Sequence, residues 1–307
     1  MQTGGLDGQC RDLAAWRREL LMERTVYDVG MHQGEDTEFY LSRGCRVVGV
    51  EANPQLVGGL REKFVNEVAS GRLSIIDRAI APASGKITFA INRNGSVWGT
   101  ISQAFIKRAV HTGEDLEFVE VEALPFRDIL RRYGMPYYLK VDIEGMDMEC
   151  VSALQEFTER PKFISIETAA TANIASVEAG FAELSTLWSL GYRRFKYVDQ
   201  AGLGKLDGKI LDAEGPAVRY RYRSHSSGPF GDETPGEWLT IDRALRQMQR
   251  LVRFQNKFGF GGQRQRSVFW RSARRLRRYA KRLPVNSWYD LHARIGEEDE
   301  AFCGRGQ

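Results

Sequence analysis

The sequence predicts a doubly wound α/β fold with a mostly parallel sheet. Short runs rich in β-branched residues alternate with helical stretches of about 10–15 residues, which is the pattern of βαβ units. The first run, 25–30, ends in a glycine. The second run, 46–50, is followed by a segment that leads to Pro54, a residue that suits the first turn of a helix. A chain of 307 residues with 42% hydrophobic and 27% charged residues has the composition of a globular protein.

The same alternation continues along the chain. We expect further strands at 73–76, 86–91, 117–121, 137–141, 163–166 and 193–198, and helices at 35–42, 54–70, 126–132, 146–157, 176–190 and 240–258. Residues 92–115 have no regular pattern, and 215–236 are rich in glycine and aromatic residues. Ligands of such folds bind at the carboxyl ends of the parallel strands, so site residues are expected just after those strands.

We expect one large domain with additions. A helix is predicted within residues 1–24, the main domain in 25–200 with an insertion at 86–121, and an extension of loops and basic helices in 201–307. The four cysteines form no CxxC pair, which suits a reducing compartment. The sequence contains no apolar run typical of a signal peptide or of a membrane span, so we expect a cytoplasmic protein.

The turn after the first predicted strand has the residues of a nucleotide-binding loop. Gly30 and Gly34 allow sharp turns and leave bare backbone for a flat ligand. The helix that follows directs its N–H groups and positive dipole end toward such a ligand. Glu51 ends the second strand, 23 residues after Asp28, where doubly wound folds place the carboxylate that binds ribose hydroxyls. The alternative is that the glycines are only turn residues and Glu51 an ordinary strand-end acid.

The spacing of these residues discriminates between nucleotide ligands. The sequence has no GxxxxGK[ST] segment, which excludes a P-loop. The pattern G-x-x-x-G lacks the middle glycine that lets the backbone approach a dinucleotide pyrophosphate. Asp28 would repel a pyrophosphate but would suit a ligand with an amino group and a sulfonium. The pattern therefore favours S-adenosylmethionine, with an NAD-dependent oxidoreductase as the alternative.

Four segments carry a resemblance to a known family: D28-V-G-M-H-Q-G-E-D-T37, V47-V-G-V-E-A-N-P54, Y138-L-K-V-D-I-E-G145 and F163-I-S-I-E-T168. Together they resemble the FkbM family of class I S-adenosylmethionine-dependent methyltransferases over about residues 25–170. The resemblance implies a seven-stranded sheet with an antiparallel final strand, and O-methylation as the commonest chemistry.

The resemblance also implies roles for individual residues. The turn at 28–34 would hold the methionine part of the cofactor, and Glu51 would hold the ribose. Ala52 and Asn53 would line the pocket. Asp77 would lie near the adenine, where family members often carry an amide instead. The candidate cofactor residues are Asp28, Gly30, His32, Gly34, Glu51, Ala52, Asn53, Asp77 and Asp142.

The candidate catalytic residues are Asp142, Glu144 and Glu167, which follow two later strands. Alternation along a strand end would point Asp142 and Glu144 the same way, with Lys140 behind them. Converging carboxylates can raise one another's pKa for work as a base, or can hold a hard cation such as Mg²⁺. Alternatively, Asp142 caps the next turn and Glu144 pairs with Lys140.

Methyl transfer to oxygen is an in-line displacement, in which the acceptor oxygen lies about 3 Å from the methyl group. A hydroxyl acceptor needs a base, whereas a carboxylate acceptor needs a cationic clamp. We favour a hydroxyl on a small molecule or glycan, with carboxyl O-methylation as the alternative. The candidate substrate residues are Trp98, Thr100 and His111, in an insertion that would act as a lid, and His225. His225 and His292 lie in late loops that could fold over the same site, and the alternative for each is a solvent-exposed histidine. Phe230 and Trp238 could add to an apolar wall around the acceptor or serve as ordinary core or loop anchors.

Residues 264–282 contain nine Arg or Lys and no acid, with an incomplete apolar stripe at helical spacing. Such a helix can contact an anionic membrane, RNA or an acidic partner, or can pack on the domain with a solvated arginine face. The net charge of +4 and the lack of an RNA-binding signature argue against nucleic acid. A third class of function is therefore a basic surface-binding protein with a vestigial pocket.

Overall fold

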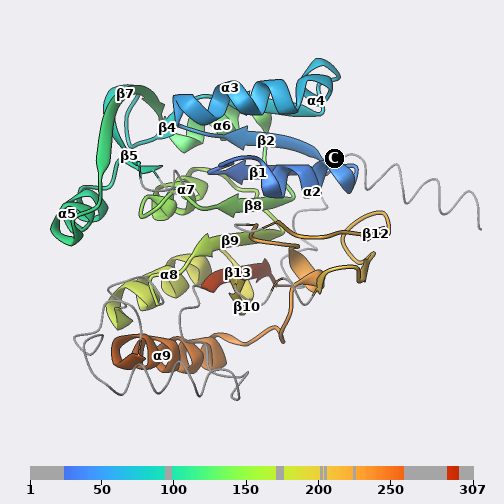
Figure 1. Cartoon of the computed structure of the whole chain (residues 1–307). Coiled ribbons are helices and arrows are strands. Elements are labelled where there is room, and N and C mark those ends of the chain that lie inside the picture. The colour runs from blue at the N-terminus through green and yellow to red at the C-terminus, as the bar shows by residue number, and fades with distance from the viewer. Residues whose placement is uncertain are drawn as a thin grey trace, which may run out of the picture. The chain divides into compact units, whose positions relative to one another are not determined.

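The computed structural model describes residues 24–93, 99–170, 176–200, 203, 206–223, 226–258 and 289–296. The chain divides into two compact units, of which unit 1 comprises residues 1–164 and 204–234 and unit 2 comprises 165–203 and 235–307. Figure 1 labels the helices and strands of both. The helix predicted within 1–24 and the basic stretch 264–282 lie outside the described residues.

Seven strands form one sheet in the order β10-β13-β9-β8-β1-β2-β3. β1 pairs in parallel with β2 and β8, β2 pairs in parallel with β3, and β10 pairs antiparallel with β13. The predicted doubly wound, mostly parallel seven-stranded sheet is therefore confirmed. The strands are β1 Thr25–Val29, β2 Arg46–Val50, β3 Leu73–Ile76, β8 Tyr138–Val141, β9 Phe163–Glu167, β10 Tyr192–Asp199 and β13 Tyr289–Ile295.

Unit 1 contains the strands whose apolar runs were clearest in the sequence. β1, β2 and β8 are buried almost throughout, because parallel strands are covered on both faces. Asn53 caps α3 by accepting the backbone N–H of Gln55 at 3.0 Å, with Pro54 in the first turn as predicted. The helices of this unit are α2 Glu35–Ser42, α3 Pro54–Lys63, α4 Val65–Ala69, α5 Gln103–Thr112, α6 Phe126–Tyr133 and α7 Asp147–Ala153.

The predicted insertion forms a second sheet with strand order β4-β7-β5-β6. β5 and β7 pair antiparallel along eight residue pairs, which confirms the strands predicted at 86–91 and 117–121. The expectation of irregular structure over 92–115 was wrong in part, because β6 and α5 lie there. The strands are β4 Ala79–Ile80, β5 Gly85–Asn92, β6 Gly99–Thr100 and β7 Leu116–Leu124.

The late segment 206–234 packs into unit 1, so the division into units does not follow the predicted boundary at residue 200. It holds two short strands, β11 Ile210–Leu211 and β12 Val218–Arg219. Phe230 is 2% exposed and stacks on Tyr138 with ring centroids 4.3 Å apart. Arg43, also 2% exposed, forms an ion pair with Glu233 at 2.6 Å. An aromatic and an ionic contact thus join a distant segment to the core of unit 1.

Unit 2 contains β10, β13 and two helices, α8 Val177–Ser189 and α9 Ile241–Phe258. Residues 289–295 were expected in an extension of loops and basic helices, which was wrong, since they form β13. His292, expected in a late loop, lies on this strand and is 1% exposed, opposite Lys196 of β10. β13 has polar residues at buried positions, so its sequence lacks the apolar pattern that predicts a buried strand. None of the helices that the structure describes is long and apolar enough to span a membrane.

We predict that Phe230→Ala lowers the free energy of unfolding by about 3–5 kcal/mol, because it removes a ring packed among Tyr40, Tyr137 and Tyr138. Urea denaturation of the full chain measures the change. Phe181→Ala is the matched control, since this side chain is 54% exposed. A loss below about 1 kcal/mol for Phe230→Ala would show that segment 206–234 is not part of the core.

Candidate cofactor site

The turn after β1 is shaped by two glycines with left-handed backbone. Gly30 has φ +88°, and a Cβ there would lie 1.9 Å from the carbonyl oxygen of Asp142. Gly34 has φ +76°, and a Cβ there would lie 2.5 Å from the ring of Phe64. Both positions therefore require glycine, for conformation and for space. At Gly30 the bare backbone admits the chain after β8. A ligand lying against this loop stays a prediction.

Glu51, at the end of β2, is 8% exposed and held by two backbone groups. One carboxylate oxygen accepts the N–H of His32 at 2.8 Å, and the other accepts the N–H of Asn53 at 2.8 Å. Burial raises the pKa of Glu51, and these two N–H donors partly offset the rise. Each oxygen of an ionised carboxylate has a second acceptor position. The carboxylate is therefore fixed in place and retains the capacity to accept two hydroxyl groups.

His32 completes this part of the loop. Its backbone lies in the left-handed region with φ +51°, and its ring nitrogen Nδ1 lies 3.1 Å from a carboxylate oxygen of Glu35. The hydrogen bond with Glu35 raises the pKa of His32, against the effect of burial. His32 thus shapes the loop through its backbone and through Glu35.

Lys140 is a buried cation at the centre of unit 1. It lies opposite Asp28 in the parallel pairing of β8 with β1, and its Nζ lies 3.1 Å from Asp28 and 3.3 Å from Asp36. The carboxylate of Asp142 is 4.0 Å away. Burial opposes the charge of Lys140, but these three carboxylates raise its pKa well above the usual value. Lys140 is therefore charged at any physiological pH.

The contacts of Lys140 bear on two predictions. Asp28, expected to attract the cationic group of a ligand, is 0% exposed and is held by Lys140 and by the hydroxyl of Thr37 at 2.6 Å. Its contact with a cofactor remains a prediction, and its charge is already compensated within the protein. The alternative that Glu144 pairs with Lys140 was wrong, because the carboxylates at this lysine are those of Asp28, Asp36 and Asp142.

Asp36 links the loop to the distant segment at 226–228. Its carboxylate accepts the hydroxyl of Ser226 at 2.5 Å and the backbone N–H groups of Ser227 at 2.9 Å and Gly228 at 3.3 Å. Asp36 lies in the first turn of α2, where a negative charge also favours the helix dipole. No role was predicted for Asp36, although it lies inside the segment D28–T37. Its serine partner is 190 residues away, beyond any local signal.

The segment after β8 departs from the predicted strand alternation. β8 ends at Val141, and Glu144 has φ +53°, so Asp142 and Glu144 do not alternate along a strand. The hydroxyl of Thr100 donates to the carbonyl of Glu144 at 2.8 Å. A Cβ on Gly145 would lie 2.7 Å from the ring of Phe105. The insertion therefore packs directly on this loop. Thr100 is 1% exposed and binds the backbone of the loop, so its contact with a substrate stays a prediction.

Asp147 is a buried acid that sequence analysis missed. It begins α7 and accepts the backbone N–H of Gly145 at 3.2 Å. Its other oxygen, Oδ1, has no hydrogen-bond partner among the described residues. Burial, followed by the negative charge of Asp142, raises the pKa of Asp147 to about 7. The carboxyl under the 142–145 loop is therefore partly protonated near neutral pH.

The chain matches a known protein family over the segment that holds this site. The Methyltransferase FkbM domain matches residues 28–194, more than half of the chain. The chain belongs to the FkbM methyltransferase family. This confirms the resemblance drawn from the four segments, and makes the protein an S-adenosylmethionine-dependent methyltransferase. A comparison with curated proteins gives no match.

Similar solved structures include the FkbM methyltransferase from Methylobacillus flagellatus KT, with 14% identity, a TM-score of 0.38, and coverage of 57% of this chain and 40% of that one. Another is an S-adenosyl-L-homocysteine complex of a methyltransferase from Thiobacillus denitrificans, with 10% identity, a TM-score of 0.34, and coverage of 93% and 91%. The family assignment itself rests on the domain match.

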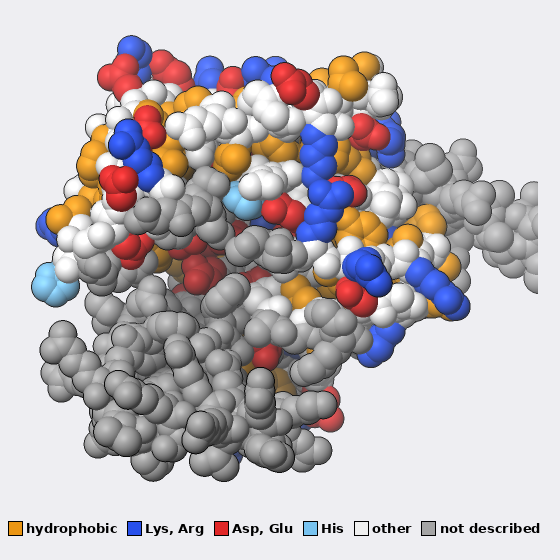
Figure 2. All heavy atoms as spheres, in the orientation of Figure 1, with side chains coloured by type: hydrophobic (Ala, Val, Ile, Leu, Met, Phe, Trp, Pro, Cys, Tyr) orange, Lys and Arg blue, Asp and Glu red, His pale blue; other side chains and the backbone are white. Residues whose placement is uncertain are grey.

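The remaining predicted cofactor residues of this FkbM methyltransferase have other visible contacts. Asp77, just after β3, is exposed and pairs with Arg61 at 2.9 Å and Arg78 at 2.8 Å, so its role at the adenine stays a prediction. Asn53 caps α3, and Ala52 packs against the core of the second sheet. Figure 2 shows basic and acidic side chains interleaved along the upper edge, where α3 and α4 lie in Figure 1.

The predicted acceptor residues of the FkbM methyltransferase are only partly described. His111 is exposed near the end of α5, while Trp98 and His225 lie outside the described residues. Glu167 ends β9 in unit 2, whereas Asp142 and Glu144 belong to unit 1. Convergence of the three carboxylates on an acceptor or a metal ion stays a prediction.

We predict that Lys140→Met lowers the free energy of unfolding by about 3–5 kcal/mol, because it leaves Asp28 and Asp36 buried without compensation. Urea denaturation measures the loss. Adding Asp28→Asn and Asp36→Asn should restore part of it, since the uncompensated charges are then removed. Lys86→Met, at a side chain 67% exposed, is the control and should change stability by less than about 0.5 kcal/mol. Equal effects of the two lysine variants would contradict a buried charge network.

Asp147 should make stability depend on pH. Its pKa is higher in the folded chain, so the folded state holds a proton that the unfolded state releases. Its stabilising contribution is therefore complete below about pH 4 and is lost as the pH rises toward about 7. We expect wild type to lose stability relative to Asp147→Asn by up to about 1.4 kcal/mol per pH unit in that window. Urea denaturation from pH 4 to 8 tests this, and a constant difference would refute it.

Proposed function

We propose that this methyltransferase binds S-adenosylmethionine at the carboxyl ends of β1 and β2 and transfers its methyl group to a hydroxyl oxygen of a small molecule or glycan. The observation that carries the cofactor part is the anchoring of Glu51. Two backbone N–H groups fix its carboxylate and leave acceptor positions for two ribose hydroxyls. Carboxyl O-methylation is the alternative reaction.

The charges of the site support a cationic ligand. Near the ends of β1, β2 and β8, the carboxyl groups of Asp28, Asp36, Glu51 and Asp142 outnumber the buried ammonium group of Lys140. An excess of carboxyl groups over cations at these strand ends favours a ligand with an ammonium and a sulfonium group over a pyrophosphate. The same balance argues against the NAD-dependent alternative. Asp28 contributes to this negative potential together with the other carboxylates around Lys140, and not by itself.

The residues of the chain would contribute mainly by positioning. When bound, S-adenosylmethionine supplies a methyl group already activated by the sulfonium. Glu51 would hold the ribose, and the turn at 28–34 would orient the methionine part, so that an acceptor oxygen can lie in line with the methyl group. A hydroxyl acceptor must lose its proton, and we assign this to Asp142, Glu144 or Glu167. Asp142 has a side chain that is 42% exposed, which leaves it accessible to an acceptor.

The environment of Lys140 favours a hydroxyl over a carboxylate acceptor. A carboxylate acceptor requires a cationic clamp, and Lys140 is already compensated by three carboxylates. Mg²⁺ held by Asp142, Glu144 and Glu167 is an alternative way to bind an anionic acceptor. Loss of methyl transfer in EDTA, restored by Mg²⁺, would support it. The buried free thiols of Cys45 and Cys150 support a reducing compartment, for which we propose the cytoplasm.

Isothermal calorimetry with S-adenosylhomocysteine tests the cofactor site. We expect Glu51→Ala to weaken binding by on the order of 100-fold, because two hydrogen bonds to a charged group are lost. Glu120→Ala, at a side chain 64% exposed on β7, is the control and should bind as wild type does. Circular dichroism verifies that both variants are folded. Unchanged binding by Glu51→Ala would place the cofactor elsewhere, and binding of NADH instead would restore the oxidoreductase alternative.

A further inference from the structure

Helix α9 of unit 2 has one buried apolar face and one exposed basic face. Ala244, Met248 and Val252 are at most 3% exposed and pack inside the unit. Arginines recur on the other side at a spacing of three and four residues, which places them on one face of a helix. They are Arg243, Arg246, Arg250 and Arg253, all exposed. The helix is amphipathic, and its polar face is cationic.

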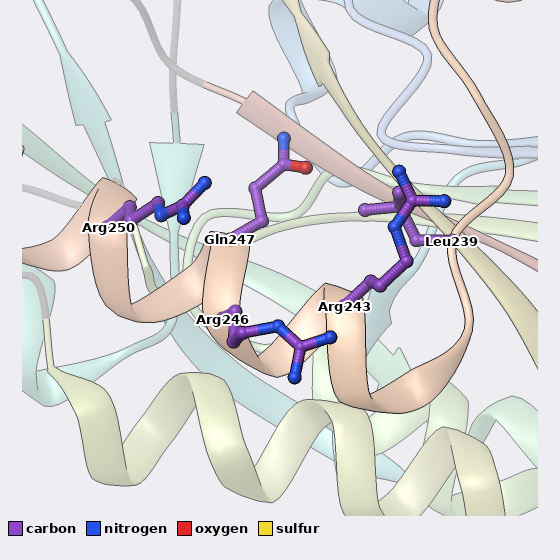
Figure 3. Close-up of a pocket in the computed structure, with 5 residues that line it drawn as sticks. All are labelled: Leu239, Arg243, Arg246, Gln247 and Arg250. Atoms are coloured by element: carbon purple, nitrogen blue, oxygen red, sulfur yellow. The ribbon is translucent and has the colours of Figure 1, made fainter.

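Part of this face forms a hollow, shown in Figure 3. Its volume is about 280 Å³, and it is lined by Leu239, Arg243, Arg246, Gln247 and Arg250. In the figure, the side chains of Arg243, Gln247 and Arg250 extend to the same side of the helix. Guanidinium and amide donors on one side of a helix suit the oxygens of phosphate groups.

The positive charge of this face is only partly compensated. Arg243 pairs with Glu237 at 3.2 Å, and Arg246 pairs with Asp242. All four side chains are more than half exposed, and ion pairs between exposed side chains contribute little to stability. Arg250 and Arg253 have no acidic partner among the residues that the structure describes. The arginines of this face can therefore bind the acidic groups of another molecule in place of Glu237 and Asp242.

The neighbouring helix α8 exposes apolar side chains in the same unit. Phe181 is 54% exposed and Trp188 is 40% exposed, separated by about two helical turns. The two helices pack closely, since a Cβ on Gly180 of α8 would lie 2.9 Å from Met248 of α9. Figure 1 shows α8 and α9 side by side. Exposed aromatic side chains on one helix and exposed arginines on the adjacent helix are the composition of surfaces that bind the membrane interface.

We propose that α8 and α9 together form a surface that binds anionic phospholipid membranes peripherally. The arginines of α9 would contact lipid phosphates, and Phe181 and Trp188 would insert between the headgroups. The arginines alone would also attract RNA, but the sequence has no RNA-binding signature, which favours the lipid partner. This membrane binding is independent of the proposed cofactor site and of the basic stretch 264–282, and it would bring the methyltransferase to a lipid surface.

Flotation of the full chain with vesicles tests the proposal. The probe is a vesicle of equal parts phosphatidylcholine and phosphatidylglycerol, with pure phosphatidylcholine as the neutral comparison. The variant Arg246→Gln/Arg250→Gln/Arg253→Gln should lower the partition coefficient by on the order of 100-fold, because each arginine near an anionic leaflet contributes about a fivefold factor. The matched control, Lys86→Gln/Arg93→Gln/Arg131→Gln, removes the same charge from exposed positions of unit 1 and should bind as wild type does.

A second variant separates lipid from other anionic partners. Phe181→Gln/Trp188→Gln removes exposed aromatic side chains without changing charge, and should weaken binding to anionic vesicles at least tenfold, because two apolar groups no longer leave water on insertion. Equal binding by the α9 variant and its control overturns the proposal. Unchanged vesicle binding by the α8 variant, or binding of single-stranded RNA without vesicle binding, overturns it as well.

Discussion

The buried ion network around Lys140 is the interaction on which unit 1 depends. It joins Asp28 of β1 to the strand beside it and to Asp36 at the start of α2, so one ammonium group fixes two strand ends and a helix. A lone buried charge in this position would be costly, and only the mutual compensation of these groups makes the arrangement stable. Asp36 then binds the backbone at 226–228, so the same network also holds a segment far along the chain.

This constraint explains how the cofactor loop is prepared. With β1 and β8 held together, the carbonyl of Asp142 approaches Gly30 so closely that no side chain fits between them. In this conformation of the loop, the backbone N–H of His32 donates a hydrogen bond to the carboxylate of Glu51. The acids that remain in excess over Lys140 give the site its negative character, which suits the methyl donor of an FkbM methyltransferase. On the other side of Asp142, Asp147 and the insertion hold the 142–145 loop, where we place the acceptor chemistry.

The sequence allowed the fold and the cofactor loop to be predicted, because both depend on local patterns: apolar strands, the capped start of α3 and the glycines at 30 and 34. It did not show that Asp28 faces Lys140, 112 residues away, since strand pairing decides this contact. The strand at 289–295 was missed because Asp290 and His292 are buried polar residues that break the apolar pattern. Asp147 looked like an ordinary residue of a first helical turn, and only its burial reveals its raised pKa.

Hydrogen–deuterium exchange with and without S-adenosylhomocysteine tests the central claim most directly, namely that the charge network prepares a cofactor site at the ends of β1 and β2. We expect slower exchange of backbone amides at 28–37, 50–54 and 140–147 when the ligand is present, with residues 85–92 of the insertion strand β5 unaffected. Unchanged exchange in the first two segments at saturating ligand, or slower exchange there with NADH and not with S-adenosylhomocysteine, would contradict it.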